Sequence, residues 1–126
     1  MAILYRSMSA IGDQPAIGPS ARMLGIRPGI DIARDNDDVS PTTGGLSVSP
    51  DSPRNLPPIR RPPVFGGTGR DPVFAIDESD LGPELVYRAD PKHPKTHGFI
   101  EPVQVVTVEQ FQRLLATTQP HWRLIT

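Results

Sequence analysis

Cysteine is absent from this chain of 126 residues, which excludes disulfide bonds, a cysteine nucleophile and thiolate metal sites. Long apolar runs are missing too, so no segment is expected to cross a membrane as a helix. The first residues lack a basic region followed by an apolar one, and we therefore expect no signal peptide. Thirteen basic residues are balanced by fourteen acidic ones, which disfavours general binding to a nucleic-acid backbone.

Several sites that carry chemistry in other enzymes are also missing. The three histidines have no acidic residues at metal-ligand spacing, so we expect no metal site. The sequence has no nucleophile elbow, and "GGTG" at 66–69 does not match a phosphate-binding loop. Serine hydrolases and nucleotide-binding enzymes of the P-loop kind are therefore disfavoured.

Proline and glycine are abundant instead, at sixteen and eleven residues. This composition approaches that of disordered chains, but several short β-type runs and one amphipathic helix favour a folded domain. Residues 51–72 contain six prolines and four arginines, and we interpret them as a long ordered loop. We expect one domain over residues 1–126, of α+β class.

The periodicity of apolar residues predicts the elements of that domain. Strands are expected at 2–8, 45–50, 73–77, 85–88 and 97–106, and residues 121–125 are a last strand or a docked tail. Pro102 predicts an edge strand or a bulge. The clearest helix is 107–115, which begins with the capping-box pair Thr107 and Gln110. A second, short helix is expected from Ser20 to Leu24, before Gly25.

Three stretches offer candidate functional residues, in the order Arg, Ser, Glu. Arg6 lies inside the apolar strand "LYRSM", where its charge needs a partner such as a phosphate. In "GGLSVSP", Ser47 and Ser49 share one face of a strand and can hold a ribose. In "THGFIEP", His97 and Glu101 share a face, and a carboxylate there can stabilise an oxocarbenium-like ribose. An arginine at a strand end, a solvated serine face and a surface glutamate are the ordinary alternatives.

The order of these pieces, followed by an amphipathic helix, resembles the small ADP-ribosyltransferase-like toxins of type VI secretion, the Tse toxin family. The resemblance runs from Tyr5 to about Leu115 and includes "VFAIDESDLGPELVYRAD" at 73–90. It implies an ADP-ribosyltransferase-like split β-sandwich with one or two helices and long Pro-rich loops. It also implies that NAD is the substrate. The implied catalytic residues are Arg6, Ser47 and Glu101, and the implied NAD-binding residues are Tyr5, Arg6, Ser47, Ser49, His97 and Glu101.

The same resemblance implies a secreted toxin effector that acts in the cytoplasm of a target cell and transfers ADP-ribose to an unknown protein, nucleic acid or small molecule. A cognate immunity protein is then the expected partner. The sequence departs from the pattern of the well-known Arg-Ser-Glu transferases at two places. The serine strand reads Leu-Ser-Val-Ser and not Ser-Thr-Ser, and Phe99 stands where the earlier acid of a Glu-x-Glu pair is usual. The second departure argues against arginine as the acceptor.

Three other interpretations remain open from the sequence. Water as the acceptor would make the chain an NAD-hydrolysing toxin. A non-catalytic module could instead present "RNLPPIRRPPVF" at 54–65 as a polyproline II ligand. Finally, the local cluster of Arg54, Arg60 and Arg61 keeps a small nuclease toxin among the alternatives, with His97 and Glu101 as acid and base.

Overall fold

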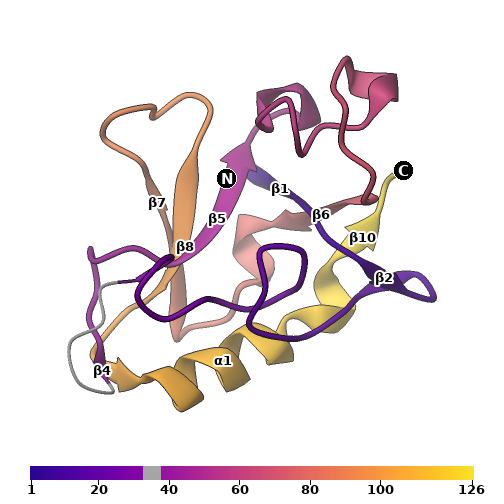
Figure 1. The fold of residues 1–126 in the computed structure, drawn as a ribbon. Coiled ribbons are helices and arrows are strands. Elements are labelled where there is room, and N and C mark those ends of the chain that lie inside the picture. Colours follow the sequence, from indigo (N-terminus) through magenta and orange to yellow (C-terminus); the bar gives the residue numbers. More distant parts are fainter. Residues whose placement is uncertain (33–37) are drawn as a thin grey trace.

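The computed structural model describes residues 1–32 and 38–126 as a mixed α+β fold, in which a six-stranded antiparallel sheet is joined by one α-helix (Figure 1). The order of strands across the sheet is β10-β6-β1-β5-β8-β7. These strands are β1 (Ile3–Ser7), β5 (Leu46–Pro50), β6 (Val73–Asp77), β7 (Leu85–Ala89), β8 (Gly98–Pro102) and β10 (Arg123–Leu124).

Shorter elements complete the fold. β2 (Ala10–Ile11) pairs with β3 (Gln14–Pro15), and β4 (Asp38–Val39) pairs with β9 (Val106–Thr107). The helices are α1 (Val108–Thr117) and the single-turn 3₁₀ helices η1 (Pro53–Asn55), η2 (Pro63–Phe65), η3 (Glu78–Asp80) and η4 (Gln119–His121). No helix within the described ranges is both long and apolar enough to span a membrane.

The large sheet is split near its middle. β1 pairs with β5 at only two positions, Leu4 with Pro50 and Tyr5 with Ser49. By contrast, β1 pairs with β6 over five positions, and so does β7 with β8. The sheet therefore consists of two halves, β10-β6-β1 and β5-β8-β7, which diverge beyond Tyr5 and Ser49 (Figure 1).

The hydrophobic core lies on one face of both halves and is covered by α1 (Figure 1). Leu4 is opposite Ile76 in one half and Leu46 is opposite Ile100 in the other, so their side chains share a face. The apolar stripe of α1 meets this face, and the core includes Leu4, Leu46, Ile76, Ile100, Phe111, Leu115 and Trp122. The predicted amphipathic helix is thus confirmed, and it joins the two halves from one side.

The N-terminus of α1 has the predicted capping box. The Thr107 hydroxyl accepts a hydrogen bond from the Gln110 amide at 3.1 Å, and the Gln110 side chain accepts one from the Thr107 amide at 2.9 Å. We expect Thr107→Ala to lower the free energy of unfolding by about 1 kcal/mol, because one amide of the first turn loses its partner. Urea denaturation measures this, with Thr117→Ala at the exposed C-terminal end of the helix as the control. Equal losses in both variants would contradict a capping role.

Two expectations about local structure are wrong. Residues 20–24 form turns and not a helix, because the Leu24 amide donates to the Ala16 carbonyl at 2.7 Å and pairs this segment with the preceding one. Gly25 allows that pairing, since a Cβ there would lie 2.0 Å from the Gly18 carbonyl oxygen. Pro102 ends an interior strand and not an edge strand, and the predicted strand 97–106 is divided into β8 and β9.

Candidate functional site

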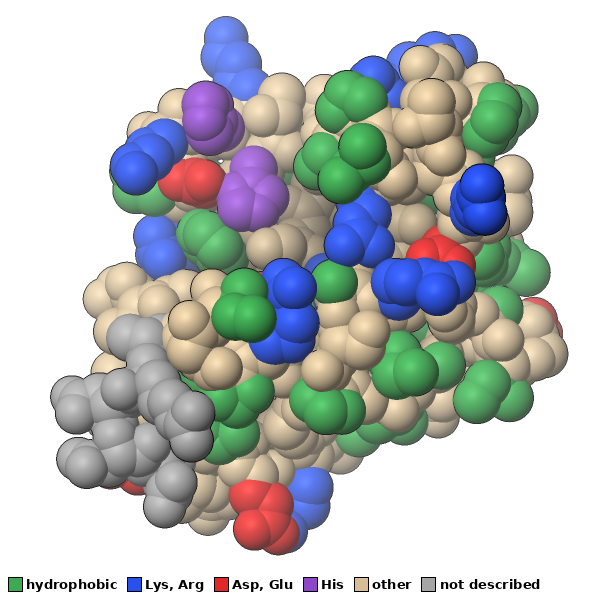
Figure 2. Space-filling model, viewed as in Figure 1, with side chains coloured by type: hydrophobic (Ala, Val, Ile, Leu, Met, Phe, Trp, Pro, Cys, Tyr) green, Lys and Arg blue, Asp and Glu red, His purple; other side chains and the backbone are tan. Residues whose placement is uncertain are grey.

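A cleft of about 210 Å³ opens where β1 and β5 diverge. It lies on the face shown in Figure 2, where a hollow is bordered by Lys and Arg side chains and by His side chains. Its walls come from both strands, from the loop that follows β3 and from the Pro-rich loop 51–72. The lining residues are Arg6, Ser7, Ala21, Arg27, Asp31, Ser47, Val48, Ser49, Leu56, Pro57, Arg60 and His97.

Arg6 closes the inner end of the split. Its guanidinium donates to the Ser47 carbonyl at 2.8 Å across the opening, and to the Met23 and Ala21 carbonyls at 2.9 and 3.3 Å. The residue is only 8% exposed, and burial lowers the pKa of Arg6 to about 10, an effect that the nearby Asp31 carboxylate opposes. Arg6 is therefore a charged group at neutral pH. It holds together the two halves of the sheet and the loop that follows β3, to which Ala21 and Met23 belong.

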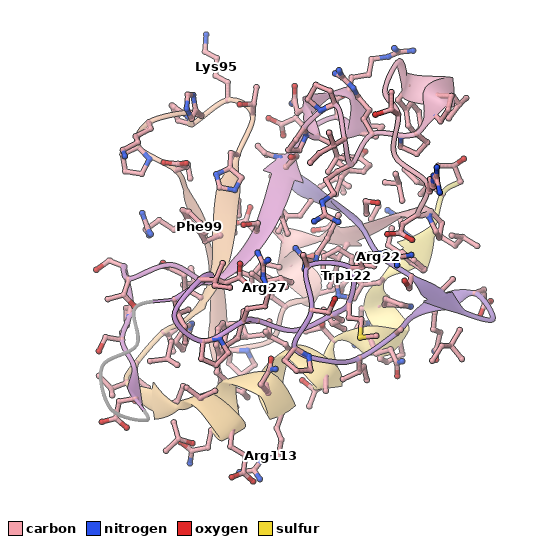
Figure 3. The ribbon with its side chains drawn as sticks, viewed as in Figure 1. Arg22, Arg27, Lys95, Phe99, Arg113 and Trp122 are labelled. Atoms are coloured by element: carbon pink, nitrogen blue, oxygen red, sulfur yellow. The ribbon has the colours of Figure 1, made fainter. Side chains whose placement is uncertain are left out.

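Two more arginines face the cleft beside one carboxylate. Arg27 forms a bidentate pair with Asp31, with Nη2 2.9 Å from Oδ1 and Nε 3.2 Å from Oδ2 (Figure 3 labels Arg27). Asp31 also accepts a hydrogen bond from the Arg27 amide at 2.7 Å, which fixes the turn through Pro28 and Gly29. Arg60 forms no ion pair with any residue that the structure describes. The cleft thus has three guanidinium groups and one carboxylate.

The two predicted serines lie on the wall formed by β5. Ser49 is buried, and its hydroxyl donates to the Asn55 carbonyl at 3.3 Å, which ties β5 to the Pro-rich loop. Ser47 is half-buried and lies opposite Phe99 of β8. Its hydroxyl has no hydrogen bond to another described residue, so it is available to a ligand in the cleft.

His97 forms part of the rim. Its Nδ1 lies 2.8 Å from Asp90 Oδ2, and this hydrogen bond lowers the pKa of Asp90. The imidazole also packs edge-on against Phe99, with 4.8 Å between the ring centroids. Because Nδ1 is engaged by the carboxylate and the ring is fixed by Phe99, Nε2 is the nitrogen that remains for a ligand.

Glu101 and Tyr5 do not line the cleft. Glu101 is 1% exposed, and both of its oxygens accept from Arg88, at 2.8 Å from Nε and 3.0 Å from Nη2. Its Oε2 also accepts from the Gly44 amide at 3.3 Å. Tyr5 is half-buried in β1, opposite Ser49 and Ala75. The structure therefore brings together four of the six predicted site residues, Arg6, Ser47, Ser49 and His97.

Sequence reasoning missed Arg27 and Asp31 as site residues, and it named Arg60 only in the basic cluster of the nuclease alternative. The turn "RPGID" at 27–31 was a usable signal, because Pro and Gly in its centre bring Arg27 and Asp31 to the same side. The basic cluster did not show that Arg60 faces this cleft, since its position depends on how the Pro-rich loop folds over β5. No group of three potential metal ligands occurs in residues 1–32 and 38–126.

Comparisons with known proteins identify no relative: no family model, curated protein or solved structure matches this chain.

Proposed function

We propose that the chain binds NAD in the cleft between β1 and β5 and transfers its ADP-ribose to an acceptor, as an ADP-ribosyltransferase-like toxin effector. The observation that carries this proposal is the charge of the cleft, where, among residues 1–32 and 38–126, Arg6, Arg27 and Arg60 face one carboxylate, that of Asp31. Arg60 is the arginine of the three whose guanidinium has no ion-pair partner among the described residues, and such a group binds phosphate oxygens through paired hydrogen bonds. Arg6 and Arg27 are engaged within the protein but add positive charge that attracts an anion. The dianionic diphosphate of NAD complements it.

The rest of the cleft supports a ribose beside that diphosphate. The Ser47 hydroxyl and the His97 imidazole are hydrogen-bonding groups on its wall and rim. The splayed strands also support the finer fold assignment, since a split sheet with an arginine on its first strand is what the resemblance implied. At about 210 Å³, the cleft is too small to enclose the whole of NAD. We therefore place the nicotinamide ribose and the diphosphate inside the cleft and the adenosine toward solvent.

The transfer itself requires stabilisation of positive charge on the ribose. The bond between ribose C1′ and the nicotinamide nitrogen breaks, its electron pair leaves with nicotinamide, and C1′ becomes cationic. An acceptor oxygen or nitrogen then attacks C1′ and loses its proton. A nearby carboxylate favours this transition state, and among the described residues the carboxylate that lines the cleft is Asp31, which is paired with Arg27. Glu101, the carboxylate predicted from the sequence, is buried and does not line the cleft. Because it accepts from Arg88 and Gly44, we assign it the role of holding β7, β8 and the start of β5 in place.

Nicotinamide release from NAD tests this proposal. We expect the purified chain to release nicotinamide, Asp31→Asn to lower kcat about 100-fold, and Arg60→Gln mainly to raise KM about tenfold. Arg113→Gln is the matched control, because Arg113 projects from α1 away from the sheet (Figure 3). If Glu101→Gln abolishes release while Asp31→Asn does not, the sequence prediction for Glu101 is right and our assignment of Asp31 is wrong. No release from NAD with or without a cell lysate as acceptor would reject the function.

The same assay separates transfer from hydrolysis. Nicotinamide release that needs a lysate indicates a macromolecular or small-molecule acceptor, whereas equal release in buffer indicates that water is the acceptor.

The alternative of a polyproline II binding module is less well supported, because residues 51–72 fold back through hydrogen bonds such as Thr68 N–H to the Pro58 carbonyl at 2.9 Å.

The toxin and delivery aspects of the proposal rest on the family resemblance. They include secretion by a type VI system, action in the target-cell cytoplasm and neutralisation by a cognate immunity protein. Expression of the unaltered chain in a bacterial cell should stop growth, and expression of Asp31→Asn should not.

A further inference from the structure

A second and larger groove, of about 690 Å³, continues from the cleft toward the connection between β7 and β8. Its two walls are the Pro-rich loop at residues 54–61 and the hairpin connection at residues 93–97. Ser49, Leu56, Pro57 and His97 border both the groove and the cleft, so a ligand in the groove lies next to a ligand in the cleft. We propose that this groove binds a single strand of nucleic acid, and that this strand is the acceptor of ADP-ribose.

The groove is basic although the chain as a whole is not. Arg54, Arg61 and His93 line it, and none of its lining residues is acidic. Lys95 projects from the tip of the same hairpin connection (Figure 3). Basic groups spread along two walls suit a chain of phosphates better than one small anion.

The two arginines are held in place before any ligand binds. The Arg54 guanidinium lies 5.9 Å from the centroid of the Phe65 ring, and Arg61 Nη1 donates to the Arg54 carbonyl at 2.8 Å. Asn55, on the same wall as the two arginines, donates to the carbonyl of Lys95 on the opposite wall at 3.3 Å, which sets the distance between the two walls. A groove with fixed cations loses little conformational entropy when it binds a phosphate chain.

The remaining surface of the groove favours bases over an acidic peptide. His93 and His97 contribute planar imidazole rings to the groove, and Pro57 and Pro58 contribute rigid apolar pyrrolidine rings. Rings and guanidinium planes of this kind stack on unpaired bases, which is how proteins usually recognise single strands. The volume of the groove is in the range that holds a nucleotide.

The acceptor role rests on the proposed function, because it needs NAD in the neighbouring cleft. A ribose hydroxyl or a base nitrogen at the junction would attack C1′ of the bound NAD, nicotinamide would leave with the electron pair, and the acceptor proton would pass to His97 Nε2 or to water. His97 suits this position because Asp90 engages its other nitrogen at 2.8 Å.

Fluorescence anisotropy with a short labelled single-stranded RNA tests the groove without NAD. We expect saturable binding that weakens about tenfold in Arg54→Gln and in Arg61→Gln, with the slope of log affinity against log salt reduced by about one for each arginine. Arg61→Lys should bind nearly as well as the wild type, which shows that charge and not folding is lost, and Arg113→Gln should bind unchanged.

Three results would overturn the proposal. They are no binding at low salt, equal binding by the glutamine variants, and displacement of the RNA by poly-glutamate as efficiently as by unlabelled RNA, which would identify an acidic protein as the partner. Competitive displacement by NAD would assign the groove to the adenosine half of NAD instead. If the wild-type chain releases nicotinamide but does not bind RNA, the proposed role of the groove is rejected and the proposed function stands. If it binds RNA but releases no nicotinamide, the proposed function is rejected and RNA binding by the groove stands.

Discussion

Arg6→Ala should lower the free energy of unfolding by about 3 kcal/mol, one of the two largest effects of any single substitution that we expect. The substitution leaves the carbonyls of Ala21, Met23 and Ser47 without their charged donor. Ala21 and Met23 belong to the loop that follows β3, and Ser47 belongs to β5. The substitution therefore removes the side chain that bridges the two halves of the sheet. Part of the loss is offset, because alanine removes the cost of burying a charge, a cost reflected in the lowered pKa of Arg6.

Urea denaturation of Arg6→Ala and Arg6→Lys measures this bridging role. Lysine keeps the charge but has one donor group where arginine reaches three carbonyls, so we expect an intermediate loss. If Arg6→Ala is as stable as the wild type and has lost only NAD cleavage, Arg6 is a ligand-binding group and does not bridge the split.

Arg88→Ala should also cost about 3 kcal/mol, because it leaves the Glu101 carboxylate buried without its cation. Glu101 is 1% exposed, and it would keep only the hydrogen bond from Gly44 N–H, at 3.3 Å. Arg88 lies 5.1 Å from the centroid of the Phe99 ring, so the substitution also removes a cation–π contact next to the cleft.

A double-mutant cycle isolates the Arg88–Glu101 interaction. We expect the loss in the double variant Arg88→Ala with Glu101→Gln to be smaller than the sum of the two single losses, because the double variant leaves no unpaired buried charge, whereas Arg88→Ala alone does. Additive losses in thermal or urea unfolding would mean that the ion pair contributes nothing. Our assignment of Glu101 as a structural group would then lose its basis.

The strands and the helix were predictable because each is encoded locally. Leu46 and Val48 alternate with serines, and Thr107 with Gln110 marks the start of the helix, so short stretches of sequence suffice. The failed helix at 20–24 shows the limit of this reasoning. The Leu24 amide donates to the Ala16 carbonyl and the Arg22 carbonyl accepts from the Ser9 amide, and no local pattern shows these partners.

The candidate site was predictable only in part, for a related reason. Strand alternation placed Glu101 on the same face as His97, but it did not reveal which side chain would pair with the Glu101 carboxylate. The β7–β8 register places Arg88 opposite Phe99, diagonal to Glu101, and a long side chain reaches across that distance. Arg60 and Asp31 enter the cleft through the folding of loops, which depends on contacts between distant segments.

The most direct test of our central claim is a titration of the isotope-labelled protein with NAD, followed by the chemical shifts of backbone amides. If NAD binds between β1 and β5, the amides of Ser47, Val48 and Ser49, together with those of Arg27 and Arg60, should shift with a single saturating curve. Amides on the exposed face of α1, near Arg113, should not move. Shifts confined to other regions, or none at millimolar NAD, would contradict the account.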